Sequence, residues 1–249
     1  MRTIRGYIDA ELTADQELAL SEDLSNHITR VLRLRVGDRL QLFDGRGREF
    51  AAELIAAERK RAQVRVGTEL AALADSPLQL TLAQGLCRGE KMDLVLQKAT
   101  ELGVQRVQPL QTERTEVKLD AEREARRMAH WRQVLISACE QSGRARVPEL
   151  AAPMALPSWL AELLADAPAA DAGSVRLMLD PEGDVVLRDL PQATRALLAV
   201  GPEGGFSEHE GDMLQRAGFT RLRLGPRVLR TETAGLAAIA ALQSHWGDF

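Results

Sequence analysis

Three glycines within five residues mark the segment Gly201–Gly205, which continues to Ser207 as Gly-Pro-Glu-Gly-Gly-Phe-Ser. Glycine lets a backbone approach a ligand closely or adopt a positive φ. Ser207 followed by Glu210 is a capping box, so a helix is expected to begin there with its N-terminal amides near the segment. The spacing matches neither the dinucleotide fingerprint nor the P-loop. The segment therefore predicts a ligand-binding turn or, more simply, a tight strand-to-helix turn without a ligand.

The segment Leu224–Ala234 is the second with residue types suited to ligand binding, and it reads Leu-Gly-Pro-Arg-Val-Leu-Arg-Thr-Glu-Thr-Ala before an alanine-rich helix pattern. Either Thr231 or Thr233 is expected to cap that helix, and Glu232 complements the positive end of its dipole. The two arginines of the segment are expected near an anionic partner. From the residues alone, the two segments predict adjacent loops that hold a small polar ligand.

The elements that must position these loops are short apolar strands, expected at 175–179, 196–200 and 221–224. Strands and helices alternate from residue 78 onward, which predicts an α/β domain with a largely parallel sheet. Ligands bind at the carboxyl ends of parallel strands, so the loops after these three strands are expected to form the active site. The remaining expected elements are strands at 80–84 and 106–110, helices at 91–102 and 120–141, and a poorly patterned, mobile insertion at 153–173.

The N-terminal part of the chain has a different pattern. A short helix is expected at 24–36, and strands at 39–43, 49–54 and 62–66 alternate polar and apolar residues between turns. Several short strands close together predict a small β-barrel. The stretch 70–77 lacks periodicity and ends at a proline, which places the domain boundary there. The expected domains are therefore 1–72 and 73–249.

Composition excludes several classes of protein. The chain has 249 residues, of which 45% are hydrophobic and 27% charged, as in soluble globular proteins. No apolar run approaches the roughly 18 residues of a membrane-spanning helix, and the N-terminus lacks a signal-peptide pattern, so no membrane partner and a cytoplasmic location are expected. Cys87 and Cys139 are too few and too far apart for a disulfide framework or a zinc site. We therefore expect no metal.

Charge is unevenly distributed along the chain. Residues 26–65 contain ten Arg or Lys against five Asp or Glu, a local charge of +5, whereas residues 151–249 contain eight against thirteen, a local charge of -5. A cationic N-terminal region suggests a part of the protein that faces phosphates. A solvated arginine face accounts for the same numbers equally well.

Four ordered strings, KMDLVLQKATELGV, ACEQSGR, VGPEGGFSEHE and LGPRVLRTETA, closely resemble motifs of the RsmE family of 16S ribosomal RNA methyltransferases in the SPOUT superfamily. HITRVLRLRVGD and DGRGREF are similar to that family's N-terminal PUA-like domain. The resemblance spans nearly the whole chain. It implies an α/β class fold, with a C-terminal SPOUT-type trefoil-knotted domain and a small PUA-like β-barrel. It also implies a homodimer that uses S-adenosyl-L-methionine to methylate a uridine at N3 in 16S rRNA of the small ribosomal subunit.

The resemblance also implies roles for individual residues. Arg230 is the candidate for stabilising negative charge on the uracil, and Glu232 the candidate base or orienting group. The expected cofactor-binding residues are Leu179, Gly201, Pro202, Glu203, Gly204, Gly205, Leu224, Gly225, Arg227, Val228, Leu229, Thr231, Thr233 and Ala234. The expected RNA-binding residues are Arg2, His27, Arg30, Arg33, Lys91, Arg114 and Arg144.

Other interpretations remain open at this stage. A non-catalytic RNA-binding protein of ribosome assembly would have the same two domains. An enzyme that uses a phosphorylated nucleotide could employ the same glycine-rich turn and arginines. The alternative role for Arg230 and Glu232 is a structural one, in which they pair with each other to hold their loop.

Overall fold

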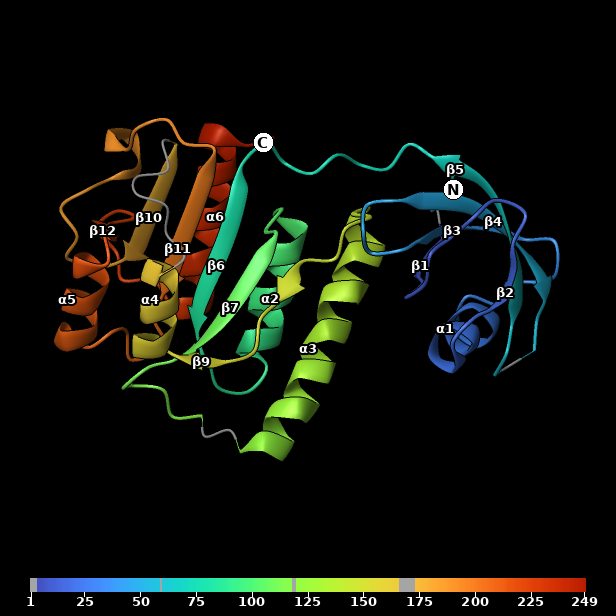
Figure 1. Cartoon of the computed structure of the whole chain (residues 1–249), viewed down its shortest axis with the longest axis horizontal. Coiled ribbons are helices and arrows are strands. Elements are labelled where there is room, and N and C mark those ends of the chain that lie inside the picture. The colour runs from blue at the N-terminus through green and yellow to red at the C-terminus, as the bar shows by residue number, and fades with distance from the viewer. Residues whose placement is uncertain (1–3, 59, 118–119, 166–172) are drawn as a thin grey trace. The chain divides into compact units, whose positions relative to one another are not determined.

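The computed structural model describes residues 4–58, 60–117, 120–165 and 173–249, which divide into two compact units (Figure 1). The first unit contains the chain up to Asp75 together with Ile136–Val147, and the second contains Ser76–Leu135 and Pro148–Phe249. Helix α3 (Ala121–Ser142) therefore contributes residues to both units. The expected domain boundary between residues 72 and 73 placed all of α3 in the second domain. Sequence periodicity predicts the helix, but it does not show that the end of the helix packs in the first unit.

The first unit is built on a five-stranded sheet with the order β1-β3-β4-β5-β2. Strands β3, β4 and β5 pair antiparallel, and β1 pairs parallel with β3. Apolar residues that alternate along these strands form one buried cluster with residues of the short helix before β3. The strands are β1 (Arg5–Tyr7), β2 (Glu17–Ala19), β3 (Arg39–Phe43), β4 (Glu49–Ala56) and β5 (Gln63–Leu70).

The helix expected at 24–36 is shorter than predicted, and that prediction was wrong at its end. Helix α1 (Glu22–Asn26) continues as the π-helix η1 (His27–Val31) and then stops. Arg33 has a φ of +57°, a backbone conformation that a helix does not contain. The amide of Leu34 returns to the carbonyl of Ile28 and closes the helix end.

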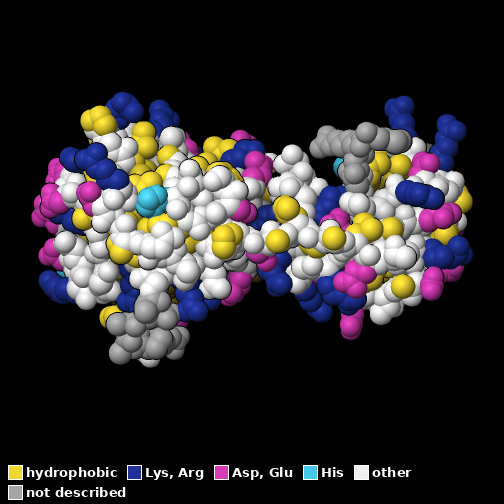
Figure 2. All heavy atoms as spheres, turned by 90° about the horizontal axis from the view of Figure 1, so that it is seen from above, with side chains coloured by type: hydrophobic (Ala, Val, Ile, Leu, Met, Phe, Trp, Pro, Cys, Tyr) yellow, Lys and Arg dark blue, Asp and Glu magenta, His cyan; other side chains and the backbone are white. Residues whose placement is uncertain are grey.

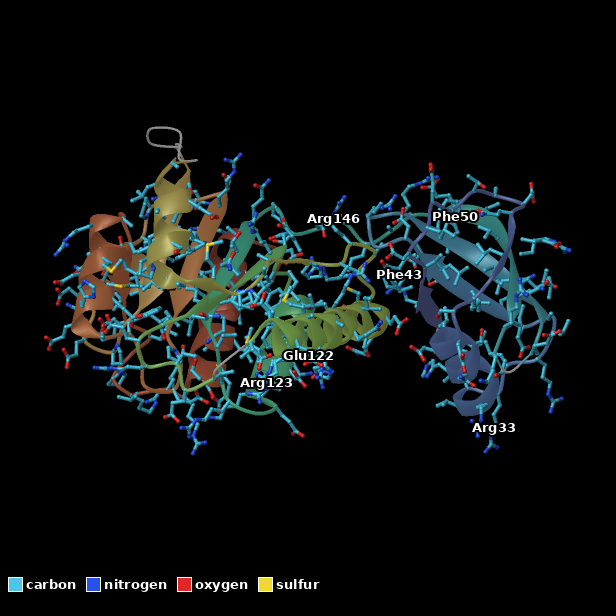
Figure 3. The ribbon with its side chains drawn as sticks, turned by 60° about the horizontal axis from the view of Figure 1, so that its bottom comes forward. Arg33, Phe43, Phe50, Glu122, Arg123 and Arg146 are labelled. Carbon is cyan, nitrogen blue, oxygen red and sulfur yellow. The ribbon has the colours of Figure 1, made fainter. Side chains whose placement is uncertain are left out.

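A buried arginine ties the end of α3 into the first unit. The Arg5 and Glu49 side chains form an ion pair at 2.7 Å, and each is only 7% exposed. Arg5 also donates to the carbonyls of Cys139, at 2.6 Å, and Arg144, at 3.2 Å. Its guanidinium lies 4.7 Å from the ring centre of Phe43, which is labelled on β3 in Figure 3. Arg5 thus donates to one carbonyl in the last turn of α3 and to one just after the helix ends.

The second unit is the α/β domain expected from the alternation of strands and helices. Its sheet has the order β12-β10-β11-β6-β7-β8, and every recorded pairing in it is parallel. The strands are β6 (Gln79–Gly85), β7 (Arg106–Gln111), β8 (Glu149–Leu150), β9 (Met154–Ala155), β10 (Ser174–Leu179), β11 (Arg195–Val200) and β12 (Thr220–Leu222).

Helices cover both faces of this sheet (Figure 1). Apolar residues of α4 and α5 share one buried cluster with β7, β10 and β11, whereas α6 packs on α2 and against β6 and β11. The helices are α2 (Lys91–Glu101), α4 (Leu156–Ala165), α5 (Glu208–Arg216) and α6 (Thr231–Trp246), with a 3₁₀ turn η2 at Leu187–Asp189.

The expected mobile insertion at 153–173 contains regular structure, so that prediction was wrong for its described residues. Residues 156–165 form α4, which buries Leu156, Trp159 and Leu160. The ring centroids of Trp159 and Phe219 lie 5.9 Å apart. Because this stretch is rich in alanine and proline, its short apolar helix face was not recognised in the sequence. Residues 166–172 lie outside the described part of the chain.

We predict that Arg5→Met destabilises the first unit by about 3–5 kcal/mol, because it leaves the Glu49 carboxylate buried without its partner. Hydrogen exchange of peptides from β3 to β5 and from the end of α3 measures this loss of protection. Arg65→Met is the matched control: Arg65 and its partner Glu17 are both 53% exposed, so the cost is at most about 1 kcal/mol. Equal exchange in the two variants would contradict the anchoring role of Arg5.

Candidate functional site

A cavity of about 790 Å³ lies at the carboxyl ends of β10, β11 and β12, where the sequence places its three loops. These strands are neighbours in the parallel sheet, which brings their loops together. Thr233, in contrast, is exposed on α6 and does not line the cavity. The expected site residues that do line it are Leu179, Gly201, Pro202, Glu203, Gly204, Gly205, Leu224, Gly225, Arg227, Val228, Leu229, Arg230, Thr231, Glu232 and Ala234.

Side chains are disfavoured at both ends of the glycine-rich turn, by lack of space at Gly201 and by a positive φ at Gly205. A Cβ on Gly201 would lie 2.8 Å from the carbonyl carbon of Gly205, and Gly205 itself has a φ of +67°. Ser207 caps α5, and the Glu210 carboxylate accepts from the Ser207 amide at 2.9 Å. This confirms the capping box. At these glycines the turn therefore presents backbone to the cavity.

Glu203, the one charged residue of the turn, anchors it to the loop after β6. Its carboxylate accepts from Lys91 Nζ at 2.9 Å and from the Arg88 amide at 3.1 Å. Partial burial works to raise the pKa of Glu203, but the hydrogen bonds from Lys91 and backbone amides outweigh it and lower that pKa. Lys91, expected to bind RNA, is thus engaged in holding the turn.

The loop after β7 holds the turn from another direction. Arg114 donates to the carbonyl of Gly204 at 2.7 Å, and the amide of Glu113 donates to the buried Glu210 carboxylate at 2.8 Å. Hydrogen bonds from Ser207 and His209 lower the pKa of Glu113. Arg114 therefore both lines the cavity and stabilises the backbone of the glycine-rich turn.

The start of α6 brings the two catalytic candidates to the cavity but not to each other. Arg230 is the N-cap residue, its side chain is exposed, and among the described residues it forms no ion pair with Glu232. One carboxylate oxygen of Glu232 is buried and has no hydrogen-bond partner among the described residues. The expected capping by Thr231 or Thr233 was wrong, because no side chain caps this helix. Thr231 instead donates to the Gly201 carbonyl at 2.6 Å.

The loop after β10 was expected at the site, but none of its residues was among the predicted site residues. Asp180, Pro181 and Glu182 line the cavity, and Asp180 forms an ion pair with Arg221 of β12 at 2.7 Å. The Asp-Pro-Glu-Gly string after an apolar strand was the available signal. Only the neighbouring positions of β10 and β12 show that these side chains meet.

The expected RNA-binding residues do not form one group. His27, Arg30 and Arg33 are exposed in and after η1, and Arg33 points away from the ribbon (Figure 3). Acidic and basic side chains are interspersed on the face of this unit in Figure 2. Arg144 is only 8% exposed and lies 3.6 Å from Asp75, so burial leaves it little surface for RNA. Arg2 lies outside the described residues.

Two absences hold for the described part of the chain. No helix there is long and apolar enough to cross a membrane. In those same ranges, no three His, Cys, Asp or Glu side chains lie close enough together to hold a metal ion.

Comparisons with known proteins assign this architecture to RNA methyltransferases. The chain matches the model of an RNA methyltransferase domain over residues 74–243 and that of an RNA methyltransferase PUA domain over residues 20–67. It is 30% identical to ribosomal RNA small subunit methyltransferase E of Buchnera aphidicola from Acyrthosiphon pisum, over 98% of this chain and 94% of that protein. It is 32% identical to the Mycobacterium tuberculosis protein of that name, over 96% and 92%.

Two solved structures are similar over 100% of both chains. One is a putative methyltransferase from Legionella pneumophila in complex with the cofactor SAM, at 41% identity and a TM-score of 0.93. The other is ribosomal RNA small subunit methyltransferase E from Neisseria gonorrhoeae bound to S-adenosyl methionine, at 38% identity and a TM-score of 0.89.

We predict that Glu203→Gln lowers the melting temperature by about 2–4 °C at neutral pH, as expected for losing roughly 1 kcal/mol in a chain of this size. Because the folded pKa of Glu203 is lowered, its stabilisation is present above the usual titration range and disappears as the pH falls through the folded value. Melting curves of both proteins from neutral to acid pH should therefore converge. Glu182→Gln, an exposed change in the same wall, should have no effect; a pH-independent difference for Glu203→Gln would refute the assignment.

Proposed function

The chain belongs to the ribosomal RNA small subunit methyltransferase E family of RNA methyltransferases, and from that premise we propose that it binds S-adenosyl-L-methionine in the described cavity and methylates a uridine at N3 in 16S rRNA. The observation that supports this most directly is the cavity formed by the loops after β10, β11 and β12. Relatives that are similar over their whole length hold SAM.

The residues around the cavity fit this cofactor. A volume of about 790 Å³ lies in the range of small-molecule sites, about 300–1,000 Å³. Backbone groups of Gly201–Gly205 and of the Leu224–Arg230 segment would hold the adenosine and the methionine part. Carboxylates of Glu182, Glu208 and Asp212 also line the cavity, which suits a ligand with a cationic sulfonium.

The chemistry assigns different work to Arg230 and Glu232. When bound, S-adenosylmethionine supplies an electrophilic methyl group. N3 of uridine lies on the Watson–Crick edge and carries a proton, so the base must be unpaired and must lose that proton. The exposed Arg230 guanidinium would stabilise the negative charge that develops on the uracil oxygens. Glu232, with its buried and unpartnered oxygen, would orient the base or accept the proton.

The proposal includes several features beyond the site. They are the trefoil knot, a homodimer through the second unit, a substrate within the small ribosomal subunit and a cytoplasmic location. The family match favours an active enzyme over a non-catalytic assembly protein or a nucleotide-dependent enzyme. Light scattering that finds a fully active monomer at assay concentration would remove the dimer from the proposal.

Methylation of small ribosomal subunits from cells that lack this gene tests the proposal. Purified protein with S-adenosylmethionine should add one methyl group per 16S rRNA, identified as 3-methyluridine by mass spectrometry of nucleosides. Gly201→Ala should abolish binding of S-adenosylmethionine, because its Cβ would lie 2.8 Å from Gly205. Gly211→Ala, in α5, adds a methyl group whose Cβ meets no atom of another element within 4 Å, and this variant should retain binding. Methyl incorporation at another atom or base would overturn the assigned reaction.

The first unit is proposed to supply RNA affinity. It matches the PUA domain model, and His27, Arg30 and Arg33 are exposed at its π-helix. Phosphate contacts by arginine make affinity fall with salt, since each contact releases counterions. A solvated arginine face would produce no such dependence.

We predict that Arg30→Glu with Arg33→Glu weakens RNA binding and flattens the plot of log affinity against log salt by roughly 1.5–2 in slope, because two phosphate contacts are lost. Affinity for S-adenosylmethionine should stay unchanged. Arg126→Glu with Arg188→Glu, two exposed arginines elsewhere, controls for the charge change. Arg230→Ala should instead slow methyl transfer at saturating RNA and leave the slope as it is. An unchanged slope for the Arg30 and Arg33 variant would remove this surface from the RNA site.

A further inference from the structure

Gln84, the penultimate residue of β6, is fully buried beneath the cavity but does not line it. Its amide nitrogen donates to the Thr231 hydroxyl at 3.0 Å and approaches the Gly201 carbonyl at 3.4 Å. It also contacts the Gly85 carbonyl at 3.1 Å and Cys87 Sγ at 3.5 Å. Gln84 was not among the predicted site residues, because it and Thr231 are 147 positions apart in the sequence.

The Thr231 hydroxyl completes a connected network. It accepts from Gln84 and donates to the Gly201 carbonyl at 2.6 Å. The Gly201 carbonyl therefore receives hydrogen bonds from two side chains. This network joins the end of β6, the first residue of the glycine-rich turn and the first residue of α6. The last two of these belong to the two polypeptide segments that enclose the cavity.

Close backbone packing surrounds the same network. A Cβ on Gly85 would lie 2.5 Å from the backbone nitrogen of Pro202, so the end of β6 rests directly on the turn. A Cβ on Gly235 would lie 3.5 Å from the Gln84 side-chain oxygen, so α6 also approaches closely. A small displacement of Gln84 would therefore shift both the glycine-rich turn and the start of α6.

The Gln84 side-chain oxygen is buried and has no partner among the described residues. An unsatisfied buried acceptor costs stability, whereas an aliphatic side chain of similar size would avoid that cost. The amide of Gln84 is thus unfavourable for packing, while its nitrogen makes the hydrogen bond that joins β6 to Thr231. Buried polar groups that cost stability in this way are expected at functional sites.

We propose that Gln84 is a positioning residue for cofactor binding. Through Thr231 and Gly201 it fixes the glycine-rich turn relative to the start of α6, so that backbone groups of both segments converge on one ligand. Because Arg230 and Glu232 flank Thr231 in sequence, the same anchor sets where these two side chains leave the backbone. This inference rests on the proposed function, since its ligand is S-adenosylmethionine.

The experiment compares binding with stability. For Gln84→Leu, calorimetric titration with S-adenosylmethionine should show a dissociation constant about tenfold higher, a loss typical of one broken positioning contact. Its melting temperature without ligand should stay equal or rise, because the unsatisfied oxygen is gone. Gln243→Leu is the matched control: Gln243 is also fully buried but bonds Ser76 and the Leu102 carbonyl near the other end of α6. It should lower the melting temperature and leave the dissociation constant unchanged.

Threonine variants keep the test decisive even if Gln84→Leu does not fold. Thr231→Val removes the hydroxyl at nearly constant shape and should weaken binding to the same extent as Gln84→Leu. Thr231→Ser should restore most of the affinity that the valine variant loses. The double variant Gln84→Leu with Thr231→Val should bind about as weakly as either single variant, because both substitutions break the same hydrogen bond between Gln84 and Thr231.

Two outcomes separate this inference from the proposed function. Wild-type protein that fails to bind S-adenosylmethionine would overturn both. Wild-type protein that binds, with Gln84→Leu or Thr231→Val within twofold of it, would overturn the positioning role alone. A dissociation constant that simply follows the melting temperature across all variants, Gln243→Leu included, would show Gln84 to be an ordinary core residue.

Discussion

Parallel pairing of β12, β10 and β11 is the constraint on which the rest of the site depends. In a parallel sheet all strands end at the same edge, so the loops that follow neighbouring strands face one another. Here three segments far apart in the sequence meet at one cavity. The adjacent strand β6 adds the buried support beneath them, through Gln84 and the close contact between Gly85 and Pro202.

Acidic and basic residues divide the work around this cavity. Carboxylates of Glu203, Glu210 and Asp180 are used to hold loops, through backbone amides, Lys91 and Arg221. The exposed arginines of the segment before α6 are not drawn into those contacts among the described residues. These arginine side chains can therefore bind an anionic or polarised substrate without first breaking an internal ion pair.

In the first unit, the arginine that stabilises the fold differs from the arginines proposed to contact RNA. Arg5 is buried between Glu49 and the carbonyls at the end of α3, where charge, hydrogen bonds and the Phe43 ring all stabilise it. Arg30 is exposed within η1 and Arg33 is exposed just after it, and neither is part of that network. The local charge of +5 covers residues 26–65, so it includes Arg30 and Arg33 but not Arg5. Burial, not charge, distinguishes the anchoring residue from the candidate RNA contacts.

The sequence by itself determined the features that depend on near neighbours in the chain. The capping box of Ser207 and Glu210, the strands β3 to β5 and the parallel alternation of the second unit all follow from spacings of a few residues. Tertiary structure decided the rest. In the folded chain, Thr231 donates to the Gly201 carbonyl and does not cap a helix, and Glu203 pairs with Lys91. Arg5 binds the end of α3, and Arg144 is buried. These contacts join residues distant in sequence, and their partners are set by strand order and burial, which local periodicity does not encode.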